Sequence, residues 1–440
     1  MINECIRFPR TLIVGTEPYH PSSSRALDAY FHNWDKASLA QVYSNPQVPI
    51  KGHCGQLFQI TDERLLQRWK GRDVETGILY EYKDLCEKPD SRDVKEISND
   101  QKKIFAIRRN HSSIVHLLRG LLWKKKYWCT SRFKQWVDDF KPECVFICSS
   151  NDFFINKISL YVAQRFNIPI VIALSDDYLF NNVSSFSPFY HLYKILYKRL
   201  MNSIFRRKGT RAIYICDKMR EKYETEFGLI GETVYLTSSV KRNAFRIINT
   251  HNPLITYFGN IGLGRNHSLN DIGYALGKID SSYRLEVYSA EKDSTVYSPL
   301  KKNRNIYFGG SIPYEEVKKK MSESDIIVIV EGFDWKDVLK TRYSLSTKAA
   351  DAIANGSSIL VYGSKECGLI DYMIKTECSF TCTSKSELVS CLKDMFSNTL
   401  RQKEYYERQI EVSQTNHTIE KSTSTTFGVI TNAICVFNQL

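Results

Sequence analysis

Two segments in the C-terminal half combine basic side chains with backbone turns that suit an anion. The first, Tyr257–Asn266, reads as a strand, a turn containing Gly262 and Gly264, and a helix that we expect to begin near Ser268–Leu269. Glycines let a backbone approach an anion closely, and a helix N-terminus presents oriented N–H groups. Arg265 adds a planar fork of donors for a phosphate. Taken alone, this turn is equally well explained as a plain strand-to-helix connection.

The second segment, Tyr343–Gly356, precedes an apolar strand. Ser346 or Thr347 is suited to cap a helix, which places Lys348 in its first turn. A cation there opposes the helix dipole unless it meets a bound phosphate. Asp351 lies about one turn further on, where a carboxylate could accept hydrogen bonds from both hydroxyls of a ribose. The alternative is a Lys and an Asp on a solvated helix face.

The two segments, with the run Tyr307–Val317 and the strand Asp325–Val330 between them, resemble the nucleotide-sugar domain of GT-B glycosyltransferases. The resemblance is greatest to family 4 enzymes, which build bacterial surface polysaccharides. It lies in the order and spacing of the elements and covers roughly Leu254–Leu392. It implies a nucleotide-sugar donor such as a UDP- or GDP-sugar, no cofactor, no metal, and transfer that usually retains the anomeric configuration.

The resemblance also implies roles for individual residues. Arg265 would contact the donor phosphates, Lys348 would do the same or line the donor pocket, and Asp351 would hold the ribose. The turn Gly309–Ser311, with Gly310 at its centre, would lie near the nucleobase.

This sequence departs from the family at one position. The family has a carboxylate eight positions before Asp351, and here that position is Tyr343. Glu331, at the end of a strand, is a candidate substitute. The departure also motivates an alternative in which the chain is an inactive GT-B scaffold.

The N-terminal half offers candidates for acid–base chemistry. The strand and loop Leu12–Arg25 resemble the GT-B loop that touches acceptor or donor, and His20 is its one group that titrates near neutral pH. Asp176 and Asp177 follow another strand, where a carboxylate could act as a base or orient an acceptor hydroxyl. The alternative is that Ser22–Ser24 and the two aspartates only cap helices.

The basic residues suggest where the protein works. The formal net charge is +13. Lysines and arginines alternate with aromatic and aliphatic residues over 121–128 and 189–211, which favours peripheral contact with an anionic membrane, unless these are solvated helix faces. They form no recognised nucleic-acid module, so we expect no nucleic-acid partner, although a nucleic-acid-binding protein stays as an alternative.

Apolar runs alternate with amphipathic stretches, which predicts an α/β fold of two successive Rossmann-like, doubly wound domains. We expect an acceptor domain at 1–245, a donor domain at 246–415 and a C-terminal helix at 416–440 that could pack on the first domain. Val240–Pro253 is the expected linker, and Asp73–Asp100 reads as a loop or insertion. The expected strands are Thr11–Gly15, Leu39–Ser44, Cys144–Ser149, Pro169–Ser175, Arg211–Cys216, Thr233–Ser238, Leu254–Phe258, Leu285–Ser289, Asn305–Phe308, Asp325–Val330, Ser358–Tyr362 and Ser379–Thr383.

Composition fits a globular enzyme, because 42% of residues are hydrophobic and 25% charged. The N-terminus lacks the pattern of a signal peptide, no long stretch is uninterruptedly apolar, and the 12 cysteines are scattered, so we expect reduced thiols in a cytoplasmic protein at the inner face of the plasma membrane. The predicted activity is that of a glycosyltransferase of the hexosyltransferase type, which extends a surface glycan such as capsule or O-antigen. A sugar-nucleotide epimerase of the same fold is the alternative enzyme.

Overall fold

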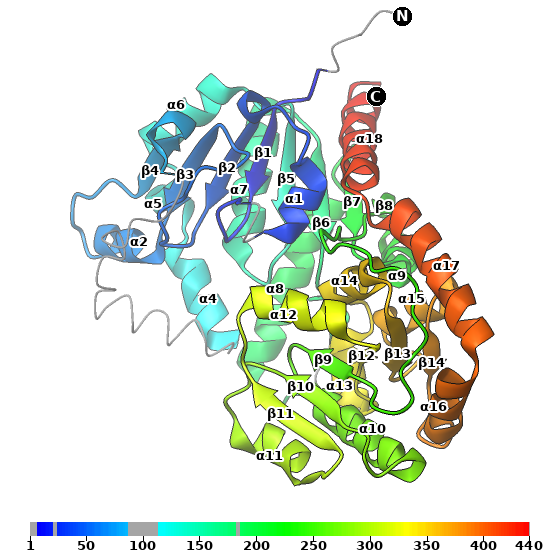
Figure 1. Cartoon of the computed structure of the whole chain (residues 1–440). Helices are drawn as coiled ribbons and strands as arrows, with labels where there is room; N and C mark the ends of the chain where they lie inside the picture. The colour runs from blue at the N-terminus through cyan, green and yellow to red at the C-terminus, as the bar shows by residue number, and fades with distance from the viewer. Residues whose placement is uncertain (1–6, 21–23, 87–112, 182–184, 440) are drawn as a thin grey trace, which may run out of the picture.

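The computed structural model describes residues 7–20, 24–86, 113–181 and 185–439. Two mainly parallel sheets, each covered by helices, lie one above the other in Figure 1. This arrangement confirms the predicted α/β architecture of two doubly wound units. The predictions for 87–112 and for Ser22 and Ser23 lie outside the described residues.

The N-terminal sheet has the strand order β4-β3-β2-β1-β5-β6-β7-β8. All neighbours are parallel except β4, which pairs antiparallel with β3 at one edge. Strands β1 and β6 are buried along their whole length, as expected for parallel strands with helices on both faces. The strands are β1 Thr11–Val14, β2 Leu39–Tyr43, β3 Gln56–Ile60, β4 Gly77–Glu81, β5 Cys144–Cys148, β6 Ile170–Leu174, β7 Arg211–Tyr214 and β8 Gly231–Thr233.

Two expectations for this half were wrong. The segment Asp73–Asp100 contains β4, because Ile78–Tyr80 can pair with the edge of β3, a partner that sequence periodicity did not reveal. β8 begins at Gly231, two residues before the expected strand, and the chain leaves the sheet after Thr233. The helices and 3₁₀ turns of this half are α1 Arg25–Phe31, η1 Lys36–Ser38, α2 Asp62–Trp69, η2 Tyr82–Asp84, α4 Ser113–Leu122, α5 Lys125–Trp128, α6 Ser131–Phe140, α7 Phe153–Phe166, α8 Pro188–Phe205 and α9 Asp217–Phe227.

The C-terminal sheet is parallel throughout, with the order β11-β10-β9-β12-β13-β14. The order reverses between β9 and β12, and open α/β sheets bind ligands beyond the carboxyl ends of the strands at such a point. The strands are β9 Ile255–Phe258, β10 Leu285–Tyr288, β11 Ile306–Gly310, β12 Ile326–Val330, β13 Ser358–Tyr362 and β14 Phe380–Cys382. The helices are α10 Arg265–Ile279, α11 Ser294–Lys302, α12 Tyr314–Glu323, α13 Trp335–Thr341, α14 Thr347–Asn355, α15 Gly368–Thr376 and α16 Leu388–Ser397.

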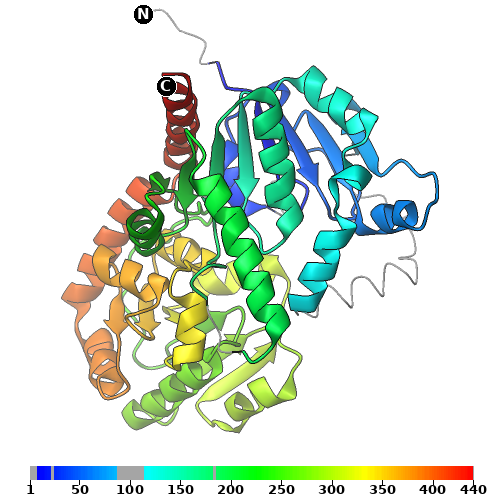
Figure 2. The ribbon, with the colours of Figure 1, turned by 180° about the vertical axis from the view of Figure 1, so that it is seen from behind.

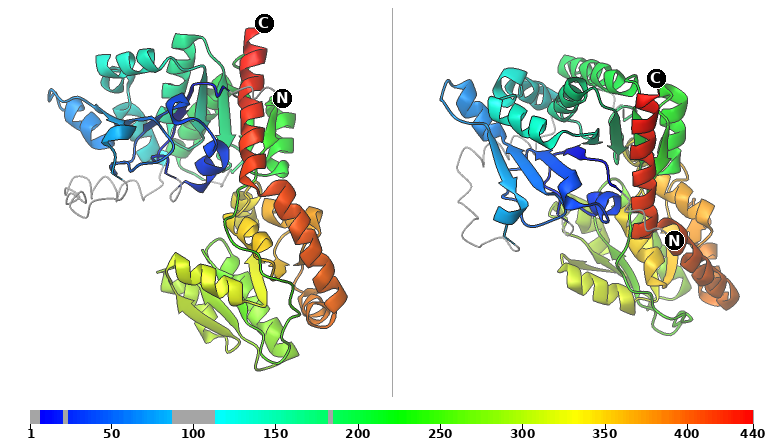
Figure 3. Two further views of the ribbon diagram at one scale, coloured as in Figure 1. Left: turned by 45° about the horizontal axis from the view of Figure 1, so that its top comes forward. Right: turned by 90° about the horizontal axis from the view of Figure 1, so that it is seen from above.

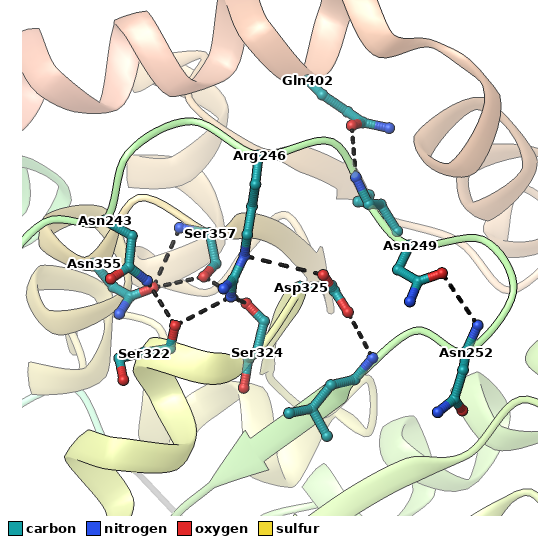
Figure 4. A network of polar contacts seen from close by, with 12 residues as sticks. Asn243, Arg246, Asn249, Asn252, Ser322, Ser324, Asp325, Asn355, Ser357 and Gln402 are labelled. Atoms are coloured by element: carbon teal, nitrogen blue, oxygen red, sulfur yellow. Dashed lines mark hydrogen bonds and ion pairs between the residues drawn. The ribbon is translucent and has the colours of Figure 1, made fainter.

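The segment between the two sheets, 234–254, is held by polar contacts to the C-terminal half (Figure 4). The amide of Asn243 donates to the carbonyl of Ser322 at 2.7 Å. The Arg246 guanidinium donates to the Ser324 carbonyl and lies 4.0 Å from the Asp325 carboxylate. Asp325 in turn accepts from the backbone N–H of Leu254 at 2.8 Å. The connecting segment is therefore anchored to the C-terminal half over most of its length.

Two long helices complete the chain. α17 (Thr399–Asn416) packs on α14 and α16, whereas α18 (Ile419–Asn438) crosses back and packs on α1, β6 and β7 of the N-terminal half (Figure 3). His417, between them, is buried. Its Nδ1 is hydrogen-bonded to the Leu236 carbonyl and its Nε2 to the Tyr372 hydroxyl, each at 2.8 Å. The chain thus passes between the halves twice, and α18 belongs to the N-terminal core.

Ile430→Ala tests the packing of α18. Ile430 is fully buried in the N-terminal core, so the truncation should lower the free energy of unfolding by about 2–5 kcal/mol through lost burial and a residual cavity. Urea unfolding followed by circular dichroism measures it. Leu400→Ala is the control, since Leu400 on α17 is 81% exposed and should change stability by no more than about 0.5 kcal/mol. Equal effects of the two variants would contradict the packing.

Candidate functional site

The turn after β9 brings backbone close to a cationic side chain. Gly259 has φ of +126° and Gly264 has φ of +74°, conformations that favour glycine. A Cβ on Gly259 would lie 2.4 Å from the Lys348 Nζ, so only glycine leaves room for that amine. Helix α10 begins at Arg265, earlier than the expected Ser268–Leu269, because Gly264 in the left-handed conformation ends the turn directly before it.

Arg265, at the first position of α10, forms an ion pair with Glu331 at the end of β12. The Arg265 Nη2 lies 2.8 Å from the Glu331 Oε2, and the side chains are 14% and 4% exposed. Burial raises the pKa of Glu331, and the charges of Arg265 and Lys348 partly oppose that rise. The carboxylate thus lies beside the predicted phosphate-binding arginine, where sequence alone gave it only as a substitute for the carboxylate missing at Tyr343.

Lys348 lies in the first turn of α14, as predicted. Ser346, rather than Thr347, is the N-cap, and its hydroxyl accepts from the Lys348 N–H at 3.3 Å. The Lys348 Nζ donates to the Tyr257 hydroxyl at 3.1 Å. Burial, together with the charge of Arg265, lowers the pKa of Lys348 to about 8. Two cations and one carboxylate therefore meet at the N-termini of α10 and α14. This arrangement suits an incoming anion.

Asp351 does not extend this cluster in the structure. It forms a two-pronged ion pair with Arg25 of α1, at 2.7 and 2.9 Å, and accepts from the Ser238 hydroxyl at 2.7 Å. Both carboxylate oxygens thus have partners from the N-terminal half. A ribose would have to share or replace these partners, and its contact with Asp351 remains a prediction. Sequence reasoning missed Arg25 as a partner, because a separation of 326 residues leaves no local signal.

Tyr343 and Gly310 occupy different surroundings. Tyr343 is buried and packs edge-on against Phe180, with ring centroids 6.1 Å apart. It therefore serves interdomain packing at the position where the resembled family has a carboxylate. Gly310 has φ of +70° and open space around the position of a Cβ, and Gly262 donates its N–H to the Asn260 side chain at 2.6 Å. Contacts of both glycines with a donor remain predictions.

The acid–base candidates of the N-terminal half differ in their engagement. Asp177 accepts from the N–H groups of Leu179 and Phe180, each at 3.0 Å, and from the Tyr223 hydroxyl at 2.9 Å. It thus stabilises a bend in the chain, and no helix begins there for it to cap. Asp176 is exposed, accepts a hydrogen bond from the Tyr178 hydroxyl at 3.3 Å, and has a pKa raised by partial desolvation.

His20 lies in the loop after β1. Burial lowers the pKa of its imidazole, and the nearby Asp28 opposes that shift. Its backbone carbonyl accepts from the Ser24 N–H at 2.9 Å, directly before α1. Asp176 is the more exposed of the two aspartates and therefore the more accessible to an acceptor. A catalytic role for Asp176, Asp177 or His20 remains a prediction.

Comparisons with solved structures identify the fold. The structure of Anabaena HepE in complex with UDP superposes with a TM-score of 0.58 at 9% identity, over 94% of this chain and 97% of that one. Sucrose-phosphate synthase from Thermosynechococcus elongatus gives 0.56 at 10% identity, over 95% and 97%. WaaG, a glycosyltransferase involved in lipopolysaccharide biosynthesis, gives 0.52 at 10% identity, over 94% and 98%. The chain has the GT-B fold.

Sequence comparisons add nothing to this assignment. No protein-family model matches the sequence, and no curated protein matches it. At identities near a tenth, the superpositions establish the architecture and leave the activity to be argued from the site.

Proposed function

We propose that this protein transfers a sugar from a nucleoside-diphosphate sugar to a hydroxyl acceptor. The observation that carries the proposal is the convergence of Arg265 and Lys348 at the N-termini of α10 and α14, beside the glycine turn after β9. HepE, which shares the fold, has been seen with UDP and with UDP-glucose. A uridine diphosphate sugar is therefore the first donor to test, followed by a guanosine diphosphate sugar.

The proposed chemistry rests on the charge of the leaving group. As the glycosidic bond to the donor breaks, negative charge grows on the departing diphosphate. Arg265 and Lys348 would stabilise that charge more strongly in the transition state than in the ground state, which is how such groups accelerate a reaction. The ion pair with Glu331 keeps Arg265 oriented before the donor binds. The step needs no metal ion, because basic side chains and helix N-termini supply the compensating charge.

On the acceptor side, we assign the task of orienting the hydroxyl to Asp176, because it is exposed beyond the end of β6. A raised pKa brings a carboxyl closer to the range in which it can exchange protons. The proposed acceptor is a surface polysaccharide. The sugar would be transferred to it with retention of the anomeric configuration. WaaG, which has the same fold and acts in lipopolysaccharide biosynthesis, supports that class of acceptor.

Nucleotide binding is the first expectation to test. UDP at about 100 times its dissociation constant should add about 2.7 kcal/mol of stability and raise the melting temperature by several degrees without magnesium. Arg265→Ala and Lys348→Ala should abolish the shift. Thermal melts with UDP, GDP, ADP, CMP and TDP identify the preferred base.

The matched control is Lys302→Ala, which removes an exposed cation at the end of α11. It should keep the nucleotide shift in full. If no nucleotide raises the melting temperature, or if the three variants respond alike, the proposed donor site is wrong, and the inactive-scaffold interpretation gains support.

Nucleotide affinity should also depend on pH in a defined direction. The pKa of Lys348 is lowered to about 8, so the amine is charged below this pH and loses its proton above it. UDP affinity should therefore be constant between pH 6.5 and 7.5 and fall by up to about tenfold per pH unit above 8. Calorimetric titrations from pH 6.5 to 9 measure this. Lys348→Arg retains its charge throughout, so an equal decline in that variant would exclude Lys348 as the cause.

A surface on the N-terminal half supports membrane contact. Helices α4 and α8 pack side by side, as seen from behind in Figure 2. Large apolar side chains are exposed along one face of each helix, and we call this surface the α4–α8 face. Its members are Ile114, Leu118, Leu121, Phe189, Leu192, Ile195 and Leu196, each at least 39% exposed.

Exposed cations border the α4–α8 face. Lys124, Lys125 and Lys126 follow α4, and Lys198 and Arg199 continue the stripe of α8. Apolar side chains rimmed by cations fit a lipid surface with anionic headgroups. Within 121–128, however, Trp123 and Trp128 are buried in the core, so only part of that predicted segment can face a membrane. Within the described residues, no helix is long and apolar enough to cross a bilayer.

Vesicle co-sedimentation tests the α4–α8 face. The protein should bind phosphatidylcholine vesicles that contain phosphatidylglycerol better than neutral ones, and less as salt rises. Ile195→Glu should weaken binding at least about tenfold, since it removes an exposed apolar anchor and adds a repelled charge. Leu400→Glu, on α17, is the control, since Leu400 is also exposed, at 81% against 51% for Ile195. Equal losses would place the contact elsewhere.

A further inference from the structure

A cluster of metal-binding side chain types lies in the N-terminal half, apart from the Arg265–Lys348 site. Asp28 lies in α1, His32 is the residue directly after that helix, and His53 comes from the loop before β3. The Asp28 Oδ1 lies 3.1 Å from the His32 Nδ1 and 3.8 Å from the His53 Nε2. All three potential ligand atoms lie within 4.8 Å of one another.

These separations are close to those of a tetrahedral metal site. Zinc binds histidine nitrogen at about 2.0–2.1 Å, so two ligand atoms on one ion are about 3.3 Å apart. The observed spacings between Asp28 and the two histidines bracket that value. One cation could thus contact all three atoms after small side-chain movements.

The backbone also holds the three groups together. His32 follows α1 directly and keeps helical backbone angles, so it shares one face with Asp28, four residues earlier. The ring of His53 stacks on Tyr19, with centroids 5.5 Å apart, and the Tyr19 hydroxyl donates to Asp28 at 3.5 Å. A Cβ on Gly52 would lie 2.7 Å from the Tyr19 carbonyl, so glycine is what lets this loop approach.

We propose that Asp28, His32 and His53 bind a divalent transition-metal ion, with zinc as the best match. Two imidazoles and one carboxylate suit zinc and its neighbours in the first row, whereas magnesium and calcium prefer oxygen ligands throughout. Three protein ligands leave further coordination positions for water. The side chains are between 17% and 40% exposed, so the ion can enter from solvent.

A plain hydrogen bond explains only part of the cluster. An Asp–His pair one helical turn apart is common, and it accounts for His32. It does not account for His53, whose Nε2 faces the same carboxylate oxygen from a separate loop. A shared ligand gives one reason for both.

The site would connect a loop to the helix that contacts the other half. Arg25, which pairs with Asp351, is the first residue of α1 and lies one turn before Asp28. An ion bound by Asp28, His32 and His53 would tie α1 to the loop before β3 and so support the position of Arg25. The proposed transfer chemistry does not pass through this ion.

Cobalt substitution tests the proposal on the full chain, purified without a histidine tag and treated with a chelator. Titration with Co²⁺ should give visible d–d absorption that saturates at one equivalent and is displaced by Zn²⁺. His53→Ala and Asp28→Asn should each weaken zinc binding at least about tenfold in competition with a chromophoric chelator. His251→Ala, an exposed histidine in the connecting segment, should leave it unchanged.

Other outcomes overturn the proposal. Unaltered zinc affinity in both ligand variants would do so, as would absence of binding at micromolar metal. A near-ultraviolet sulfur-to-cobalt charge-transfer band would assign the ion to cysteines instead. Circular dichroism and thermal melts of the metal-free variants show whether they are folded, and His32→Ala provides a third, independent ligand change. None of these readouts depends on nucleotide binding or sugar transfer, so the proposed function and the metal site can fail separately.

Discussion

Arg265, Lys348 and Glu331 place two positive charges and one negative charge where water has little access. Burying charge is costly unless it is paired, and here the pairing is incomplete. The lowered pKa of Lys348 reflects that cost, because deprotonation is the way a buried amine escapes it. A bound diphosphate would supply the missing negative charge. With Lys348 protonated, these three side chains carry one excess positive charge, which a bound anion would balance.

The surrounding structure brings these three charged side chains together. The parallel strands β9 and β12 are neighbours in the sheet, and the segments that follow them bring Arg265 and Glu331 together. Gly259 leaves space for the Lys348 amine, and the Ser346 cap begins α14 so that Lys348 falls in its first turn. The connecting segment is bonded to the amino-end region of the same sheet, through Ser324 and Asp325.

The sequence predicts the features of this site that depend on neighbouring residues, but not the contacts between segments far apart in the chain. The apolar runs of β12 and β13, the glycine turn and the cap before Lys348 are all encoded within a few residues, and they were predicted. The pairing of β4 with β3, and of Arg25 with Asp351, depends on segments that only the folded chain brings together. The early start of α10 depends on a positive φ at Gly264, which glycine permits and does not require. Tyr343 could be recognised as a departure, but its packing against Phe180 could not.

The Arg25–Asp351 pair connects the two halves at the point where the proposed donor would lie. If a ribose donated hydrogen bonds to Asp351, it would compete with the guanidinium of Arg25 and with the Ser238 hydroxyl for the same two oxygens. The halves would then lose one contact as the donor arrives, while the two chain crossings, near Ser238 and His417, would still hold them together. Under that proposal, donor binding and the relative position of the halves would be thermodynamically linked through one carboxylate.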